Sequence, residues 1–128
     1  MTQEHKELLI KDLCTRLPYG NLVIDFNGIR TTLHDIKVFQ LYDSDDVIED
    51  YVCLIDIFGD NDYVAVENIK PYLFPLSSMT EEQQLFYSTH LNYIPYYQRV
   101  DWFNENHLDY RGLISMGLAE DATGLNIY

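Results

Sequence analysis

Hydrophobic residues at the start of the chain recur at helical spacing. Between residues 3 and 17, apolar side chains return every three or four positions, among them Leu9 and Leu13. Thr2 has the side chain of an N-cap, and Pro18 followed by Gly20 favours the end of a helix. The pattern predicts an amphipathic helix over residues 3–17.

A hairpin is predicted next, because Asn27-Gly28 is typical of a tight two-residue turn. Pairing across this turn places Phe26 opposite Ile29 on the face that the apolar alternation assigns to the core. Asp25 and Arg30 then lie opposite each other on the solvated face. A shift of one residue would bury both charges, so this register is favoured.

Apolar runs bounded by turn residues predict three further strands, at 36–42, 51–58 and 63–67. The run at 51–58 is apolar almost throughout, which indicates a central strand. Two prolines bracket a short extended piece at 72–74, which fits only the edge of a sheet.

The pattern returns to helical spacing in the last third of the chain. Thr80 and Gln83 form a capping box, which predicts a helix to about His90. Pro95 suits the first turn of another helix. Glycines interrupt the remaining tail, which is expected to form turns and short helical pieces.

These elements predict a single α+β domain over residues 1–128. We expect an N-terminal helix, a mainly antiparallel sheet of four to five strands, and two C-terminal helices packed on one face. The residues expected in the core are Leu9, Leu13, Leu22, Ile24, Phe26, Ile29, Ile55, Ile57, Val64 and Val66.

The composition supports a packed core and suggests an interface. Of the 128 residues, 47% are hydrophobic and 14% aromatic, which excludes an intrinsically disordered chain. Eleven tyrosines and six phenylalanines exceed what a small core can enclose. Some tyrosines are therefore expected at the surface or at a binding face, although half-buried tyrosines with solvated hydroxyls are an alternative.

The cysteines and the N-terminus indicate a reducing compartment. Cys14 lies on the apolar stripe of the first helix and Cys53 in an apolar strand, so both are predicted to be buried. Two such cysteines make no disulfide framework. The N-terminus lacks the build of a signal peptide, and no apolar run approaches about 18 residues. We expect a soluble cytoplasmic protein that does not bind membranes.

Catalytic and metal-binding patterns are weak. The four histidines are scattered, and the cysteines have no zinc-site spacing. Asp56, Asp60 and Asp62 lack the acid–glycine order of a calcium loop. No serine stands in a nucleophile elbow. No catalytic, metal-binding or cofactor-binding residue is predicted, and a small enzyme of unknown class stays an alternative.

The negative charge is concentrated in the middle of the chain. Between residues 38 and 69 there are nine acidic residues and no lysine or arginine, which supplies −9 of the net charge of −13. Such a segment repels nucleic-acid phosphates and anionic membranes and attracts basic surfaces. Direct binding of nucleic acid is therefore not expected.

Four segments have a distinctive sequence: LPYG at 17–20, KPYLFPLSSMT at 70–80, DWFN at 101–104 and DYRGLI at 109–114. Together they resemble segments of small uncharacterised proteins from anaerobic gut bacteria, their phages and mobile elements. The resemblance implies a bacterial or phage setting and carries no activity or functional residue with it.

The function that the sequence favours is a non-catalytic protein–protein interaction module whose partner has a basic surface. A nucleic-acid mimic that inhibits a DNA-binding enzyme is an alternative. Trp102 and Arg111 lie among aromatic residues and are of the types that dominate binding hot spots, although Trp102 could instead belong to the core. The candidate partner-binding residues are Asp43, Asp45, Asp46, Glu49, Asp50, Asp60, Asp62, Glu67, Trp102 and Arg111.

Overall fold

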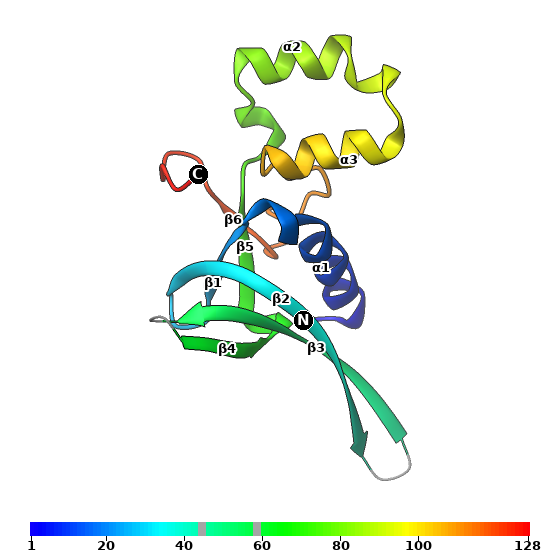
Figure 1. Cartoon of the computed structure of the whole chain (residues 1–128), viewed down its shortest axis with the longest axis vertical. Helices are drawn as coiled ribbons and strands as arrows, with labels where there is room; N and C mark the ends of the chain where they lie inside the picture. The colour runs from blue at the N-terminus through cyan, green and yellow to red at the C-terminus, as the bar shows by residue number, and fades with distance from the viewer. Residues whose placement is uncertain (44–45, 58–59) are drawn as a thin grey trace. The chain divides into compact units, whose positions relative to one another are not determined.

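The computed structural model describes residues 1–43, 46–57 and 60–128, and it describes only the backbone of those that lie between 38 and 63. Contacts divide the chain into two compact units, an N-terminal unit of Met1–Pro71 and a C-terminal unit of Tyr72–Tyr128. The α+β class is confirmed by an N-terminal helix, an antiparallel sheet and two later helices (Figure 1). That the chain forms one domain stays a prediction.

The N-terminal unit opens with the predicted helix, α1, at Gln3–Arg16. The Thr2 hydroxyl caps it by accepting the backbone N–H of His5 at 3.1 Å. A short 3₁₀ turn, η1 at Leu17–Tyr19, follows, and Gly20 then takes a left-handed conformation with φ of +64°. The proline–glycine sequence therefore ends the helix where expected.

The first five strands are β1 at Leu22–Asp25, β2 at Arg30–Asp43, β3 at Asp46–Ile57, β4 at Asp60–Ala65 and β5 at Ile69–Leu73, and a 3₁₀ turn, η2 at Val66–Asn68, links the last two. They pair antiparallel in the order β4-β3-β2-β1-β5 (Figure 1). The second strand of the predicted hairpin and the predicted strand at 36–42 form one strand, β2. The predicted piece at 72–74 overlaps β5, which has a neighbouring strand on both sides, so its expected place at a sheet edge is wrong.

The predicted register of the first hairpin is wrong by one residue. Ile24 pairs with Arg30, not with the residue after it. Val23 is consequently fully buried and Asp25 is 6% exposed, whereas Phe26 is 69% exposed. The face that was expected to be solvated therefore faces the core at β1.

The physical reason is the chemistry of Asp25 in the turn. Its Oδ1 accepts the backbone N–H of Asn27 at 2.8 Å and that of Ile29 at 3.0 Å. Gly28 alone in this turn has a positive φ, of +79°, whereas the tight turn expected for Asn27-Gly28 needs a positive φ at both residues. A longer turn closed by a carboxylate replaces it, and its hydrogen bonds offset the cost of burying Asp25.

The core of the N-terminal unit confirms part of the expected list. Leu9, Leu13, Val64 and Val66 are buried as predicted. The predicted burial of Phe26 is wrong, and Leu22, Ile24 and Ile29 are only half-buried. The side chains of Ile55 and Ile57 lie outside the described residues. The buried hydrophobic residues that the prediction missed in this unit include Val23 and Ile69.

Helix α1 buries a charged pair that the apolar stripe did not include. Asp12 and Arg16 are both fully buried. The Arg16 guanidinium donates from Nε to Asp12 Oδ2 at 2.7 Å and from Nη2 to Oδ1 at 3.1 Å. Cys14 points outward and is exposed, so its predicted burial is wrong; Cys53 has no described side chain.

The C-terminal unit contains α2 at Glu81–Thr89 and α3 at Tyr96–Glu105, with Pro95 as the N-cap residue of α3. Short 3₁₀ turns, η3 at Leu76–Ser78 and η4 at Leu91–Tyr93, precede each helix. The tail then forms turns, as expected, and returns as β6 at Glu120–Asp121, parallel to the end of β5. That the two helices pack on the sheet stays a prediction.

Candidate functional site

Strands β2 and β3 continue beyond their neighbours as a two-stranded ribbon. They pair without a break from Val38 opposite Tyr51 to Asp43 opposite Asp46. In the described part of the chain, β1 pairs with β2 no farther than Thr32, and β4 pairs with β3 no farther than Val52. We call residues 38–43 and 46–51 the acidic ribbon; Figure 1 shows the two strands running side by side past β1 and β4.

Four of the predicted partner-binding residues lie on the acidic ribbon. The backbone register places Asp43 opposite Asp46, Glu49 opposite Gln40, and Asp50 opposite Phe39. The ribbon sequence contains these four acids, seven apolar residues and no lysine or arginine. The combination of apolar and acidic residues is suited to a partner that is both apolar and basic.

The other predicted acids are placed differently. Asp60 and Asp62 lie in β4, opposite Ile57 and Ile55 of β3. Glu67 lies in η2, where its Oε2 is 2.8 Å from Nζ of Lys6, so its charge is already balanced. Asp45 lies outside the described residues.

Trp102 and Arg111, the two predicted anchors, belong to an aromatic cluster of the C-terminal unit. Trp102 meets Phe103 edge-on with ring centroids 5.3 Å apart. Phe103 stacks on Tyr110 at 4.8 Å, and the Arg111 guanidinium carbon lies 4.8 Å from the centre of the Tyr110 ring. Both anchors are half-buried, so the cluster contributes to packing as well as to the surface.

Several tyrosines of the C-terminal unit are exposed, as the composition predicts. Tyr93 is 88% exposed, Tyr96 69% and Tyr97 64%. Tyr96 and Tyr97 open α3, and the Arg99 guanidinium carbon lies 5.5 Å from the centre of the Tyr96 ring. These residues form an exposed aromatic segment at the start of α3.

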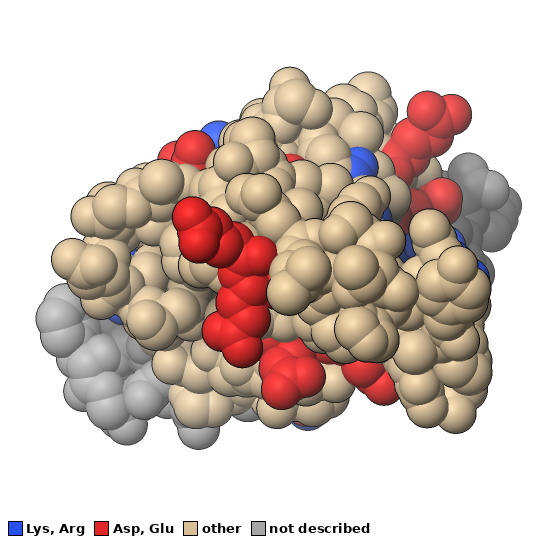
Figure 2. Space-filling model, turned by 90° about the horizontal axis from the view of Figure 1, so that it is seen from above, with Lys and Arg blue, Asp and Glu red and all other residues tan. Residues whose placement is uncertain are grey.

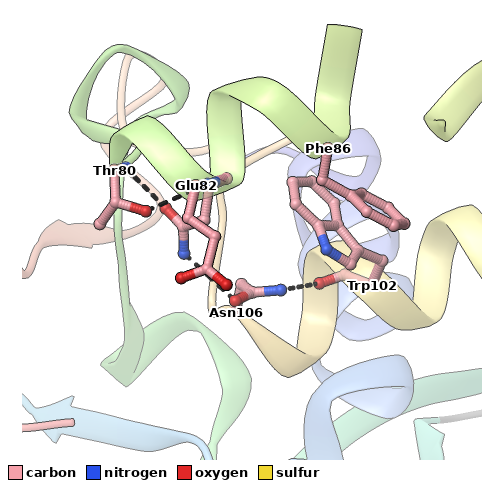
Figure 3. Close-up of a pocket in the computed structure, with 6 residues that line it drawn as sticks. Thr80, Glu82, Phe86, Trp102 and Asn106 are labelled. Atoms are coloured by element: carbon pink, nitrogen blue, oxygen red, sulfur yellow. Dashed lines mark hydrogen bonds between the residues drawn. The ribbon is translucent and has the colours of Figure 1, made fainter. Parts of the chain in front are cut away.

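A pocket of about 310 Å³ lies between α2 and α3 of the same unit (Figure 3). Its lining residues are Thr80, Glu82, Gln83, Phe86, Trp102 and Asn106. Thr80 and Gln83 make the reciprocal hydrogen bonds of the predicted capping box, at 2.9 and 3.2 Å. Gln83 Nε2 also donates to Asn106 Oδ1 at 3.1 Å, and Asn106 Nδ2 donates to the Trp102 carbonyl at 2.8 Å.

Sequence reasoning found only Trp102 among these lining residues as a candidate for binding. It identified Thr80 and Gln83 for their capping role alone. The contact between Gln83 and Asn106 joins residues 23 positions apart, and no local pattern marks such a pair.

A second pocket, of about 220 Å³, is lined mainly by aromatic and aliphatic side chains together with Arg99. Among the residues with described side chains, no group of three or more His, Cys, Asp and Glu residues could hold a metal ion. No helix in the described ranges is long and apolar enough to cross a membrane.

Acidic side chains are also exposed outside the ribbon. On the face drawn in Figure 2, they form several separate patches, and few atoms of lysine or arginine are visible there. The pKa of one exposed acid, Asp121, is lowered by the hydroxyl and then the backbone N–H of Thr123, which donate to Asp121 Oδ1 at 2.6 and 2.8 Å. Although Cys14 is exposed, the surrounding protein partly desolvates its thiol and raises the pKa of that thiol, which favours the unreactive protonated form.

Comparison of the chain with protein-family models, with curated proteins and with solved structures gives no match.

Proposed function

We propose that this protein is a non-catalytic interaction module that binds a protein with a basic surface through its acidic ribbon. The observation that carries the proposal is the ribbon itself: two paired strands with four acids, seven apolar residues and no base. We also propose that it acts in the cytoplasm of a bacterial or phage-infected cell, as the sequence resemblance implies.

The ribbon supplies two kinds of attraction. A two-stranded hairpin alone is marginally stable in water, so a partner that covers its apolar residues also stabilises it. In the described part of the chain, no third strand pairs with residues 38–43 or 46–51, so the outer edges keep backbone groups available for a partner strand. The acids accelerate encounter with a basic surface, and the exposed tyrosines of α3 offer further contact area.

The proposal is tested by capturing partners from a bacterial lysate and then measuring association rates for the partner found. Replacement of Asp46, Glu49 and Asp50 by lysine should slow association by about tenfold or more and weaken its salt dependence. The matched control replaces three exposed acids of the C-terminal unit by lysine, which changes the net charge equally: Glu81, Asp101 and Glu105. Equal association rates for both triple variants would show that the ribbon is not the binding surface.

The nucleic-acid mimic is a sharper form of the same proposal. It is favoured by the absence of any lysine or arginine between residues 38 and 69. If the captured partner is a DNA-binding enzyme, the protein should compete with DNA for it, and the ribbon variant should compete less well than the control. Simultaneous binding of DNA and this protein would contradict mimicry and leave the interaction module in place.

A further inference from the structure

The pocket between α2 and α3 presents one negative charge that no residue in the described part of the chain balances. Glu82 is exposed, and among the described residues its carboxylate makes no hydrogen bond or ion pair. The other polar side chains of the pocket are held by the hydrogen bonds described above, from Thr80 to Gln83 and on to Asn106. The walls are therefore fixed, and Glu82 remains available to a ligand.

Two aromatic side chains, Phe86 and Trp102, line the same pocket as Glu82. Trp102 stacks on Phe86 with ring centroids 5.1 Å apart and the planes 22° from parallel, so its orientation is held by packing. Figure 3 shows the Glu82 side chain and the Trp102 indole on the two sides of Asn106. Indole is the aromatic side chain that attracts cations most strongly, and a nearby carboxylate adds to that attraction.

Anionic ligands are disfavoured at the same place. The helix N-terminus would attract an anion, but Thr80 already accepts the N–H of Gln83, and Glu81 stands beside Glu82 in the first turn. A net charge of −13 opposes an anion further. These charges favour a cation over an anion in the pocket.

We infer that this pocket binds a guanidinium group. A guanidinium is planar, so it can stack on Trp102 while its N–H fork donates to the Glu82 carboxylate. An ammonium ion can also pair with the carboxylate, but it has no plane to stack on the indole. A volume of about 310 Å³ lies at the lower end of ligand pockets, which suits an arginine side chain or a small guanidino compound. This site lies on the C-terminal unit and does not depend on the acidic ribbon.

Trp102 is the only tryptophan of the chain, so its fluorescence reports directly on the pocket. The protein is titrated at constant ionic strength with N-acetyl-arginine amide, with the neutral citrulline analogue and with the lysine analogue. The arginine compound should change the fluorescence saturably, with half-saturation in the millimolar range. The citrulline compound should give no saturable change, and the lysine compound should bind several-fold more weakly.

Two variants separate the pocket from general charge effects. Glu82→Gln should weaken arginine binding by about fivefold. Glu81→Gln is the matched control, because it removes a neighbouring first-turn carboxylate that does not line the pocket, and it should weaken binding much less than Glu82→Gln does. Equal loss in both variants, equal response to citrulline, or no saturation would overturn the inference.

A further titration with methylguanidinium distinguishes the source of the group. Equal affinity for methylguanidinium and N-acetyl-arginine amide indicates a small guanidino compound, since the peptide backbone then adds nothing. Tighter binding of the amide indicates an arginine carried by a peptide or protein. Both results require guanidinium binding to have been observed first, and its absence overturns the inference for either source.

Discussion

The buried ion pair of α1 predicts a large and specific loss of stability. Asp12 and Arg16 are each 0% exposed and are joined by hydrogen bonds of 2.7 and 3.1 Å. Replacing Arg16 by methionine keeps much of the side-chain volume but leaves the Asp12 carboxylate charged in the interior. Breaking such a pair costs about 3–5 kcal/mol, a large part of the roughly 5–15 kcal/mol that stabilises a domain.

The cost is measured by urea unfolding, followed by far-ultraviolet circular dichroism and extrapolated linearly to water. The control is Lys11→Met, which removes the same charge from an exposed position of the same helix. We expect the control to change the free energy of unfolding by less than about 0.5 kcal/mol. Equal unfolding midpoints for the Arg16 and Lys11 variants would refute the assignment of a buried pair.

A double-mutant cycle tests whether the two charges act together. Asp12→Leu alone should cost about as much as Arg16→Met, because each leaves the other charge uncompensated. The double variant should be clearly more stable than the sum of the two losses predicts. Both side chains make further interactions, so recovery to the wild-type value is not expected. Additive losses would show that the pair is not coupled.

Two further predictions follow from local geometry. Asp25→Ala should lower the free energy of unfolding by about 1–3 kcal/mol, because two turn N–H groups lose their acceptor. Phe26→Ala should lower it by less than about 1 kcal/mol, because Phe26 is 69% exposed. The reverse order of the two losses in urea unfolding would contradict the observed register. Thr123→Val removes the hydroxyl that lowers the pKa of Asp121, so this pKa, followed by NMR, should rise toward its ordinary value. A lowered pKa stabilises the fold above the ordinary pKa of the carboxyl, and this contribution is lost as the pH falls through the folded pKa. The variant should therefore be less stable than wild type at neutral pH and equally stable in strong acid, and an unchanged Asp121 titration would contradict the hydrogen bond's role.

Elements with local signals were predictable from the sequence. The Thr2 cap, the end of α1 before Pro18 and the capping box at Thr80 each depend on residues within four positions of one another. Such signals act before any tertiary contact forms. The hairpin was also found at the right place, but its turn type and its register were wrong, because the carboxylate of Asp25 joined the turn.

The buried face of α1 shows how a correct spacing can be misread. Its buried residues are Leu9, Asp12, Leu13 and Arg16, which recur at intervals of three, one and three, as one face of a helix requires. The prediction counted only apolar residues and therefore rotated the stripe toward Cys14. An acid and a base four positions apart can neutralise each other and be buried together, which a hydrophobicity pattern alone does not reveal.

The two candidate binding sites also differ in how far the sequence reveals them. The acidic charge of this segment could be anticipated, because nine acids without a base are visible at 38–69 before any fold is known. The extension of β2 and β3 into a paired ribbon was not predicted, since residues 43–46 were expected to form a loop. The pocket could not be anticipated, because Glu82 and Trp102 stand twenty positions apart and line the same pocket only through the packing of α2 on α3. One sequence carries no information on which residues so far apart will meet.

The two proposed sites attract positive charge by different physics, and salt should separate them. The ribbon acts through many exposed charges at long range, and these are screened beyond a Debye length of about 10 Å at 0.1 M salt. The pocket adds stacking on Trp102 to a single ion pair at contact distance, and stacking does not depend on ionic strength in this way. Raising the salt concentration should therefore slow association with a basic protein more strongly than it weakens binding of an arginine side chain. If added salt lowers the affinity for a partner as steeply as it lowers the association rate, the ribbon alone holds that partner. Affinity that persists at high salt requires an additional contact such as the stacking of an arginine on Trp102.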